Sequence, residues 1–69
     1  MYYVYLLKSG SANEIYIGST NNLERRLTEH NNGAEISTRR YVPWSLYYYE
    51  AYPTEKLARL REKRLKHNG

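Results

Sequence analysis

The sequence YYVYLLKSGSANEIYIGS, residues 2–19, places two segments rich in aromatic and β-branched residues on either side of a short polar turn. Such residues are enriched in strands, whereas Gly, Ser and Asn interrupt them. We therefore predict strands over residues 2–8 and 14–19, joined by a turn over 9–13. Because consecutive strands with so short a connection pair with each other, this stretch predicts a β-hairpin.

The register of this hairpin depends on the length of its turn. If Gly10 and Ser11 form a two-residue type II′ loop, Tyr5 lies directly opposite Tyr16. Both hydroxyls then share one face of the hairpin, since side chains alternate between faces along a strand. A loop longer by one residue would break this alignment.

A helix is predicted after the hairpin. It begins at Asn21 or Asn22, because Asn21 with Glu24 three residues later resembles a capping box. It ends before Gly33, which suits the left-handed C′ position. Four residues at helical spacing share one side of this helix: Leu23, Arg26, Leu27 and His30.

The remaining sequence predicts a loop over residues 34–42, a third strand over 44–52 and a final helix with Thr54 as its N-cap. In the strand, one face is expected to carry Leu46, Tyr48 and Glu50, and the other Tyr47, Tyr49 and Ala51. The apolar side of the final helix is expected to comprise Leu57, Ala58, Leu60 and Leu65. On this projection Arg61 lies closer to the centre of that side than Glu62. The order of elements, β-β-α-β-α, predicts an α+β domain with helices packed on a small sheet.

The composition restricts the possible functions. Sixty-nine residues make one domain, and 11 Lys and Arg against seven acids give a net charge of +4, which favours phosphate-bearing partners. The absence of cysteine excludes disulfides and thiolate metal sites, and the apolar runs fall short of the roughly 20 residues of a membrane span. No signal-peptide pattern is present, so we expect no membrane association and a cytoplasmic protein.

The charged residues are distributed unevenly. Six of the cations fall within residues 56–66, a run that a solvated helix face also explains. All seven acids are glutamates, with no aspartate, so a metal site would rest on one glutamate with water and substrate phosphate as the other ligands.

Five side chains have the chemistry for phosphodiester hydrolysis by water. Arg26 can bind a phosphate through two parallel hydrogen bonds, and Glu62 can hold a hard divalent cation. Tyr5 or Tyr16 would act as a base if a nearby cation or metal lowered the phenol pKa from its usual value of about 10. His30 can bond a tyrosine or relay a proton.

Each of these residues also has a structural interpretation. Most of the nine tyrosines are expected to serve as scaffold, Arg26 can pair with a neighbouring glutamate, and His30 can stabilise a helix end through the dipole. Arg39 and Arg40 fit loop solvation and phosphate contact equally well.

Four sequence elements in a fixed order carry a family resemblance. Tyr3-Val4-Tyr5 stands where the family has Gly-Ile-Tyr, and Tyr16-Ile17-Gly18 matches its second motif. The segment 22–26 followed by His30 matches an Arg-x-x-x-His/Tyr element, and residues 58–66 are similar to the helix that carries a metal-binding glutamate. The chain thus resembles the GIY-YIG endonuclease superfamily, especially small stand-alone bacterial members similar to the N-terminal nuclease domain of an excision-repair excinuclease.

The resemblance implies a single GIY-YIG-like nuclease domain over 1–69, with a three-stranded antiparallel sheet flanked by helices. It implies DNA cleavage dependent on Mg²⁺ or Mn²⁺, one strand at a time, as a nicking or structure-selective enzyme of DNA repair. By this analogy Glu62 binds the metal, Tyr16 with Tyr5 positions or deprotonates the water, Arg26 stabilises the transition state, and His30 supports a tyrosine or the proton transfer. The expected DNA-binding residues are Arg25, Arg39, Arg40 and Arg61.

Three departures accompany the resemblance. Tyr3 replaces the first glycine of the motif, and Ser19 stands where excision-repair relatives have a lysine. Relatives also continue into a further basic helical stretch, so residues 1–69 are expected to be a shortened or a minimal form that lacks part of the DNA-binding surface. The alternatives are a non-catalytic nucleic-acid-binding module on the same fold and a protein-interaction domain. The protein is expected to be a monomer or a weak dimer.

Overall fold

The computed structural model describes residues 1–67 and confirms the predicted β-β-α-β-α order of an α+β fold. Residues 68 and 69 of the predicted domain lie outside the described residues. Among the residues described, no helix has the length and apolar character needed to cross a membrane. The elements are β1 (Tyr2–Ser9), β2 (Ile15–Thr20), α1 (Leu23–Asn31), a 3₁₀ turn (Arg39–Tyr41), β3 (Trp44–Tyr52) and α2 (Glu55–His67).

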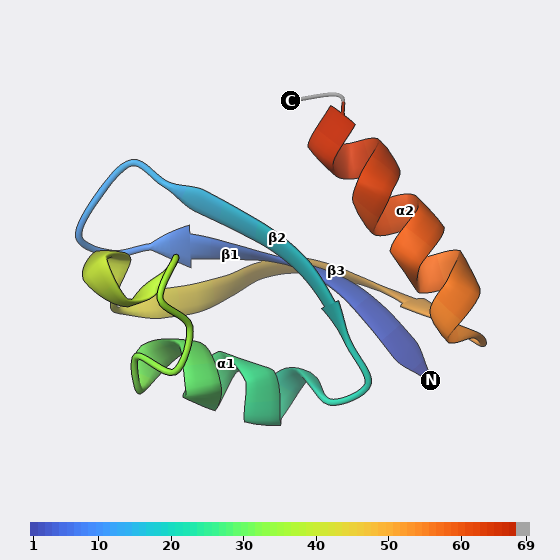
Figure 1. Ribbon diagram of the computed structural model, residues 1–69, viewed down its shortest axis with the longest axis horizontal. Helices are drawn as coiled ribbons and strands as arrows, with labels where there is room; N and C mark the ends of the chain where they lie inside the picture. Colours follow the sequence, from blue (N-terminus) through green and yellow to red (C-terminus); the bar gives the residue numbers. More distant parts are fainter. Residues whose placement is uncertain (68–69) are drawn as a thin grey trace.

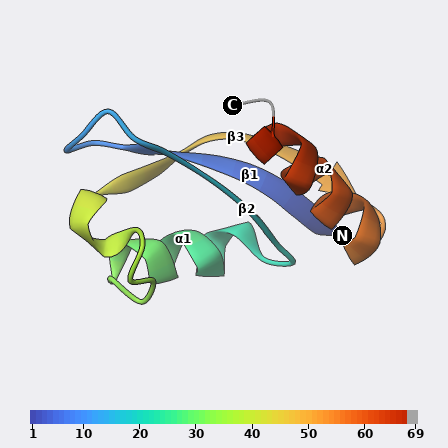
Figure 2. The ribbon, with the colours of Figure 1, turned by 45° about the horizontal axis from the view of Figure 1, so that its top comes forward.

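The three strands form an antiparallel sheet in the order β2-β1-β3, so that β1 is central. The two helices cover opposite faces of this sheet, as Figure 2 shows (the whole chain is drawn in Figure 1). The side chain of Tyr5 reaches α1, whereas that of Ser19, which follows the residue paired with Tyr5, reaches α2. Neighbouring positions of the β1–β2 hairpin therefore contact different helices, one on each face of the sheet.

The register of the β1–β2 hairpin differs from the expected one. Tyr5 pairs with Gly18, and Tyr16 pairs with Leu7. The backbone N–H of Ser9 donates to the carbonyl of Glu14 at 3.0 Å, so the loop between these two residues has four residues in place of two. The Ser9 hydroxyl accepts hydrogen bonds from two backbone N–H groups of this loop at 3.0 and 3.1 Å. Because the shift is two residues, Tyr5 and Tyr16 still share a face, as diagonal neighbours.

The third strand has its predicted bounds but not its predicted alternation. Tyr48 pairs with Leu6 and Leu46 with Leu7, so Tyr47 is an extra residue in the strand, a β-bulge. Side chains that precede the bulge in β3 therefore point to the face opposite to the one that simple alternation predicts. Leu46 and Tyr48 consequently lie on opposite faces, and the prediction that they share one was wrong.

The helix ends follow local hydrogen bonding. Asn22 is the N-cap of α1, with its Oδ1 accepting the Arg25 N–H at 3.0 Å, so the capping box predicted at Asn21 does not form. Thr54 caps α2 as predicted, since its hydroxyl accepts the N–H of Leu57 at 3.2 Å. Gly33 follows α1 with a φ of 76°, in the left-handed region that favours glycine.

The core is small, and it is centred on β1. Its buried apolar residues are Val4, Tyr5, Leu7, Trp44 and Ala58. On α2, Ala58 and the half-buried Leu65 face inward, whereas Leu57 and Leu60 are 44% and 51% exposed, contrary to the predicted apolar side. Because the narrow sheet covers only one flank of the helix, the Glu62 side chain is less exposed than that of Arg61, at 20% against 37%.

The Glu50 carboxylate on β3 links the sheet to Arg61 on the outer flank of α2. Glu50 accepts hydrogen bonds from Arg61 at 2.9 and 3.2 Å and from the hydroxyls of Tyr48 and Tyr52 at 2.6 and 2.7 Å. The Arg61 guanidinium, followed by the two hydroxyls, lowers the pKa of Glu50 to about 2. Arg61 is thus held in an ion pair on the sheet.

This ion pair predicts a pH-dependent contribution to stability. Because the folded pKa of Glu50 lies below its unfolded value, the stabilisation is complete above about pH 4.5 and is lost as the pH falls towards 2. We expect Glu50→Gln to lower the free energy of unfolding by about 1–2 kcal/mol at pH 7 and by nearly nothing at pH 2. Denaturant titrations across this range measure the difference from wild type, and Glu14→Gln is the control at an exposed residue. A difference that is independent of pH would show that the ion pair is not its source.

Candidate functional site

A buried chain of hydrogen bonds joins β1 to α1 and to the loop that follows it. The Tyr5 hydroxyl lies 3.0 Å from Nε2 of His30, and Nδ1 of His30 lies 2.9 Å from Oγ1 of Thr38. Each of these three residues is at most 2% exposed. A neutral imidazole donates through one ring nitrogen and accepts through the other, so both of its nitrogens are satisfied.

The ionisation of this pair is opposed by burial. Desolvation raises the pKa of Tyr5 above its ordinary value, and the neighbouring Tyr16 adds to the effect. Desolvation, together with the charge of Arg26, lowers the pKa of His30. Tyr5 therefore remains a neutral phenol at neutral pH, whereas a base would have to be ionised. The fully buried His30 holds the Tyr5 hydroxyl through their hydrogen bond.

Gly18 makes this packing possible. A Cβ atom at Gly18 would lie 2.6 Å from the Tyr5 hydroxyl oxygen and 2.9 Å from Cε2 of Tyr16. The Tyr16 ring packs beside both partners, with its centroid 4.6 Å from that of His30 and 6.1 Å from that of Tyr5. Gly18 therefore provides the space in which the two tyrosines meet.

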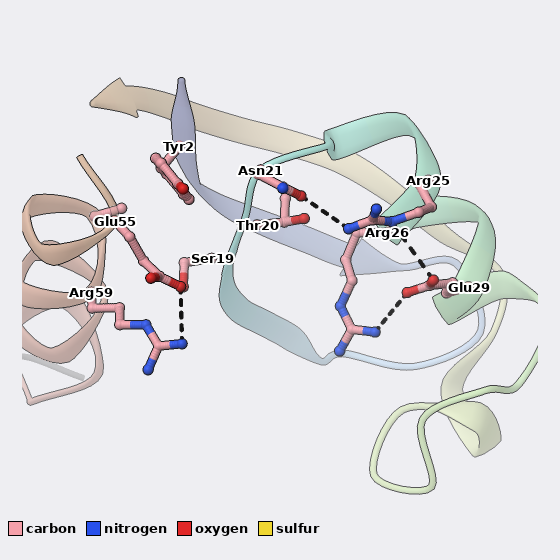
Figure 3. A pocket seen from close by; sticks show the side chains of 10 residues that line it. Tyr2, Ser19, Thr20, Asn21, Arg25, Arg26, Glu29, Glu55 and Arg59 are labelled. Atoms are coloured by element: carbon pink, nitrogen blue, oxygen red, sulfur yellow. Dashed lines mark hydrogen bonds and ion pairs between the residues drawn. The ribbon is translucent and has the colours of Figure 1, made fainter. Parts of the chain in front are cut away.

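A cleft of about 490 Å³ opens between the end of β2, the first turns of α1 and the start of α2. Figure 3 shows Arg25, Arg26 and Glu29 from α1 on one side, and Glu55 and Arg59 from α2 on the other. The end of β2 and the turn after it lie between the helices, where the polar side chains of Ser19, Thr20 and Asn21 line the cleft.

Arg26 is oriented by two carboxylates. Its Nη1 donates to Glu29 at 2.9 Å and its Nη2 donates to Glu35 at 2.8 Å. Both hydrogen bonds raise the pKa of Arg26, and the bond to Glu35 has the larger effect. The guanidinium therefore stays charged. A guanidinium has five N–H donors, and those that the carboxylates leave free can bind an anion in the cleft.

Glu62 approaches β2 from the opposite face of the sheet. Its Oε1 accepts the Ser19 hydroxyl at 2.7 Å, and its Oε2 accepts Nζ of Lys66 at 2.7 Å. Burial alone would raise the pKa of Glu62, but the hydrogen bonds from Lys66 and Ser19 outweigh it and leave the pKa below its ordinary value. Glu62 is therefore an ionised carboxylate at neutral pH.

Ser19 links the two charged groups of the site. It lines the cleft with Arg26 and donates a hydrogen bond to Glu62. Lys66, which also bonds Glu62, lines a second hollow together with Tyr16. Of the five residues expected to take part in hydrolysis, Tyr5, Tyr16 and His30 pack together, Arg26 lines the cleft with Ser19, and Glu62 bonds Ser19 from α2. Tyr5 and His30 form the buried part of this group, and Arg26, Tyr16 and Glu62 form its accessible part.

The residues expected to bind DNA lie in three separate places, and only Arg25 is in the cleft. Arg25 lines the cleft, where its Nη2 donates to Asn21 at 3.0 Å. Arg39 and Arg40 are exposed on the 3₁₀ turn, with Arg40 over the ring of Tyr41, and they do not line the cleft. Arg61 lies on the far flank of α2, paired with Glu50.

Sequence reasoning missed four polar residues that complete the site. Ser19 and Lys66 hold Glu62, Glu35 holds Arg26, and Thr38 holds His30. Lys66 follows Glu62 at the i,i+4 spacing of a helical ion pair, a signal that was present in the sequence. Glu35 and Thr38 lie in an irregular loop, and no periodicity indicates where such a loop folds back.

Comparison with known proteins identifies the family of this chain. The family described as "GIY-YIG catalytic domain" matches residues 1–69. The chain belongs to this family. GIY-YIG membership supports a nuclease-type function and implies a nucleic-acid substrate, in agreement with the resemblance seen in the sequence.

Individual GIY-YIG relatives cover nearly the whole chain. A UPF0213 protein of Clostridium perfringens is 42% identical over 67 residues, which are 96% of this chain and 71% of that protein. A UPF0213 protein of Bacillus pumilus is 39% identical over 66 residues, 94% of this chain and 66% of that protein. The solution NMR structure of a UPF0213 protein from Bacillus halodurans has a TM-score of 0.57 at 32% identity, over 97% of this chain and 72% of that one. The chain therefore spans about two thirds to three quarters of the length of these relatives.

The close packing at Gly18 predicts a large effect of one methyl group. Gly18→Ala places a Cβ against two rigid rings, so we expect it to lower the free energy of unfolding by about 1–3 kcal/mol. Gly10→Ala is the matched control, since its Cβ would meet Pro43 Cγ at 3.2 Å, and it should cost less. Denaturant unfolding of both variants makes the comparison. Equal losses would contradict the special role of Gly18.

Proposed function

We propose that this protein is a divalent-metal-dependent DNA endonuclease that hydrolyses one phosphodiester at a time. The observation that carries the proposal is that a charged guanidinium, Arg26, and an ionised carboxylate, Glu62, lie on either side of one residue, Ser19. Phosphoryl transfer needs positioned positive charge and an activated water far more than covalent chemistry from the protein. Family membership supports the same reaction class.

Arg26 is proposed to bind the phosphoryl group. Its ion pairs with Glu29 and Glu35 fix the plane of the guanidinium, and its side chain lines the cleft. As water attacks phosphorus and one ester P–O bond breaks, negative charge grows on the phosphoryl oxygens. A fixed cation stabilises that charge without reorganisation.

Glu62 fits a hard divalent cation such as Mg²⁺ or Mn²⁺. It supplies an ionised oxygen donor, and the adjacent Ser19 hydroxyl orients it. Among residues 1–67 no group of three or more His, Cys, Asp or Glu residues gathers to hold a metal. Glu62 would therefore hold the cation alone, with water and phosphate oxygens as the other ligands. A cation bound there supplies Lewis-acid stabilisation and lowers the pKa of a bound water.

Tyr16 is proposed to position the attacking water. It is only half-buried, and its ring is fixed by the buried pair of Tyr5 and His30 behind it. Tyr5 and His30 act as positioning residues, because burial keeps both from the substrate. The rings of this hydrogen-bonded pair pack against the Tyr16 ring and hold it in place.

The alternative is a nucleic-acid-binding module that does not cleave. One observation favours it: the ionic groups that hydrolysis needs are already compensated within the chain. Lys66 pairs with Glu62, and both Glu29 and Glu35 pair with Arg26. The nuclease proposal requires that substrate and metal compete successfully with these partners.

Cleavage of supercoiled plasmid DNA distinguishes the two functions. We expect wild type to produce nicked circles with Mg²⁺ and none with EDTA. Glu62→Gln removes the charge that holds the cation, and Tyr16→Phe removes the hydroxyl that holds the water, so each should slow nicking at least about 100-fold. Glu14→Gln, the same change of charge at an exposed residue, should leave the rate unchanged.

Two results would contradict the proposal in different ways. Unchanged cleavage in both site variants means that the assigned site is wrong. Binding of DNA by wild type without any cleavage, across plasmid and branched substrates, supports the binding module instead.

A further inference from the structure

The cations of α2 are sorted onto two flanks of the helix. At about 100° per residue, four of them fall within an arc of roughly 80° that begins next to Glu62 and extends to the side of α2 turned away from the sheet. Arg61 and Arg64 lie outside this arc, and the contacts agree, since Lys66 bonds Glu62 and Arg61 bonds Glu50. We call the four cations of this arc the α2 basic stripe: Lys56, Arg59, Lys63 and Lys66.

The stripe is continuous with the cleft of the candidate site. Arg59 lines the cleft together with Arg25 and Arg26. It also lines two further hollows along α2, one shared with Lys63 and Lys66 and the other shared with Lys56 and Lys63. Arg59 therefore connects the cations along α2 to the cleft, although Glu55, Leu60 and Glu62 also line these hollows.

Part of the charge of the stripe is uncompensated. Arg59 pairs with Glu55 at 3.1 Å and Lys66 with Glu62 at 2.7 Å. Lys56 and Lys63 form no ion pair with any residue from 1 to 67, and both are exposed. By contrast, Arg61 is neutralised by Glu50.

We propose that the α2 basic stripe binds the phosphate backbone of the nucleic acid and leads one strand into the cleft at Ser19. This inference rests on the proposed function and deepens it by naming the contact surface. From Lys56 to Lys66 the helix rises about 15 Å, which matches the axial length of about four base-pair steps of a B-form duplex. The main contacts then come from Lys56 and Lys63, in place of the predicted Arg39, Arg40 and Arg61.

Salt-dependent binding of a fluorescein-labelled 20-base-pair duplex, measured by anisotropy in EDTA, tests this surface without cleavage. The variant Lys56→Gln/Lys63→Gln removes two charges that make no ion pair in the described part of the fold. The control Arg39→Gln/Arg64→Gln removes two exposed charges outside the stripe. For the stripe variant we expect binding more than about tenfold weaker at 0.1 M salt, and a slope of log K against log[salt] shallower by about 2. The control should stay within about threefold of wild type.

Three further outcomes are informative. If the control loses as much affinity as the stripe variant, only net charge matters and the proposal is overturned; it is also overturned if the stripe variant binds like wild type. If the stripe variant alone loses affinity but wild type never cleaves DNA, the surface is supported and the nuclease function fails separately. Circular dichroism of both variants confirms that their folds match.

Discussion

The hydrogen bond between the Tyr5 hydroxyl and His30 is the constraint on which the arrangement of this small domain depends. Both side chains are essentially inaccessible to water, so a missing partner would leave a buried polar group unsatisfied at a cost of about 1–3 kcal/mol. That cost is a large part of the roughly 3–5 kcal/mol that a core of this size provides. The bond fixes α1 against β1, and Thr38 extends the same restraint to the following loop.

The same constraint determines where the accessible chemistry lies. With Tyr5 turned towards His30, only a glycine at position 18 leaves room for the ring of Tyr16 beside it. The end of β2 is then open to α1 on one face and to α2 on the other, so that Arg26 and Glu62 approach Ser19 from opposite sides. A narrow sheet of three strands makes this possible, since β2 is an edge strand and residues of both helices line the cleft at its end.

Much of this arrangement followed from the sequence, because it depends on periodicity and on local caps. Strand alternation placed Tyr5 and Tyr16 on one face, and helical spacing placed Arg26 beside His30. The failures have physical causes: the Ser9 hydroxyl stabilises a longer hairpin loop, and a bulge at Tyr47 reverses the start of β3. The partners of Arg26 and His30 in the loop after α1 were beyond prediction, because tertiary packing, not a repeating pattern, brings Glu35 and Thr38 to them.

The end of β2 is proposed to form one site in which Glu62 holds a divalent cation. Titration of ¹⁵N-labelled protein with substoichiometric Mn²⁺, followed by NMR, tests this directly, because a bound paramagnetic ion broadens the resonances of nearby residues. We predict broadening centred on Ser19, Glu62 and Lys66, and its absence in Glu62→Gln. Broadening centred on Glu50 or Glu29, or unchanged in that variant, would contradict a cation site at Glu62.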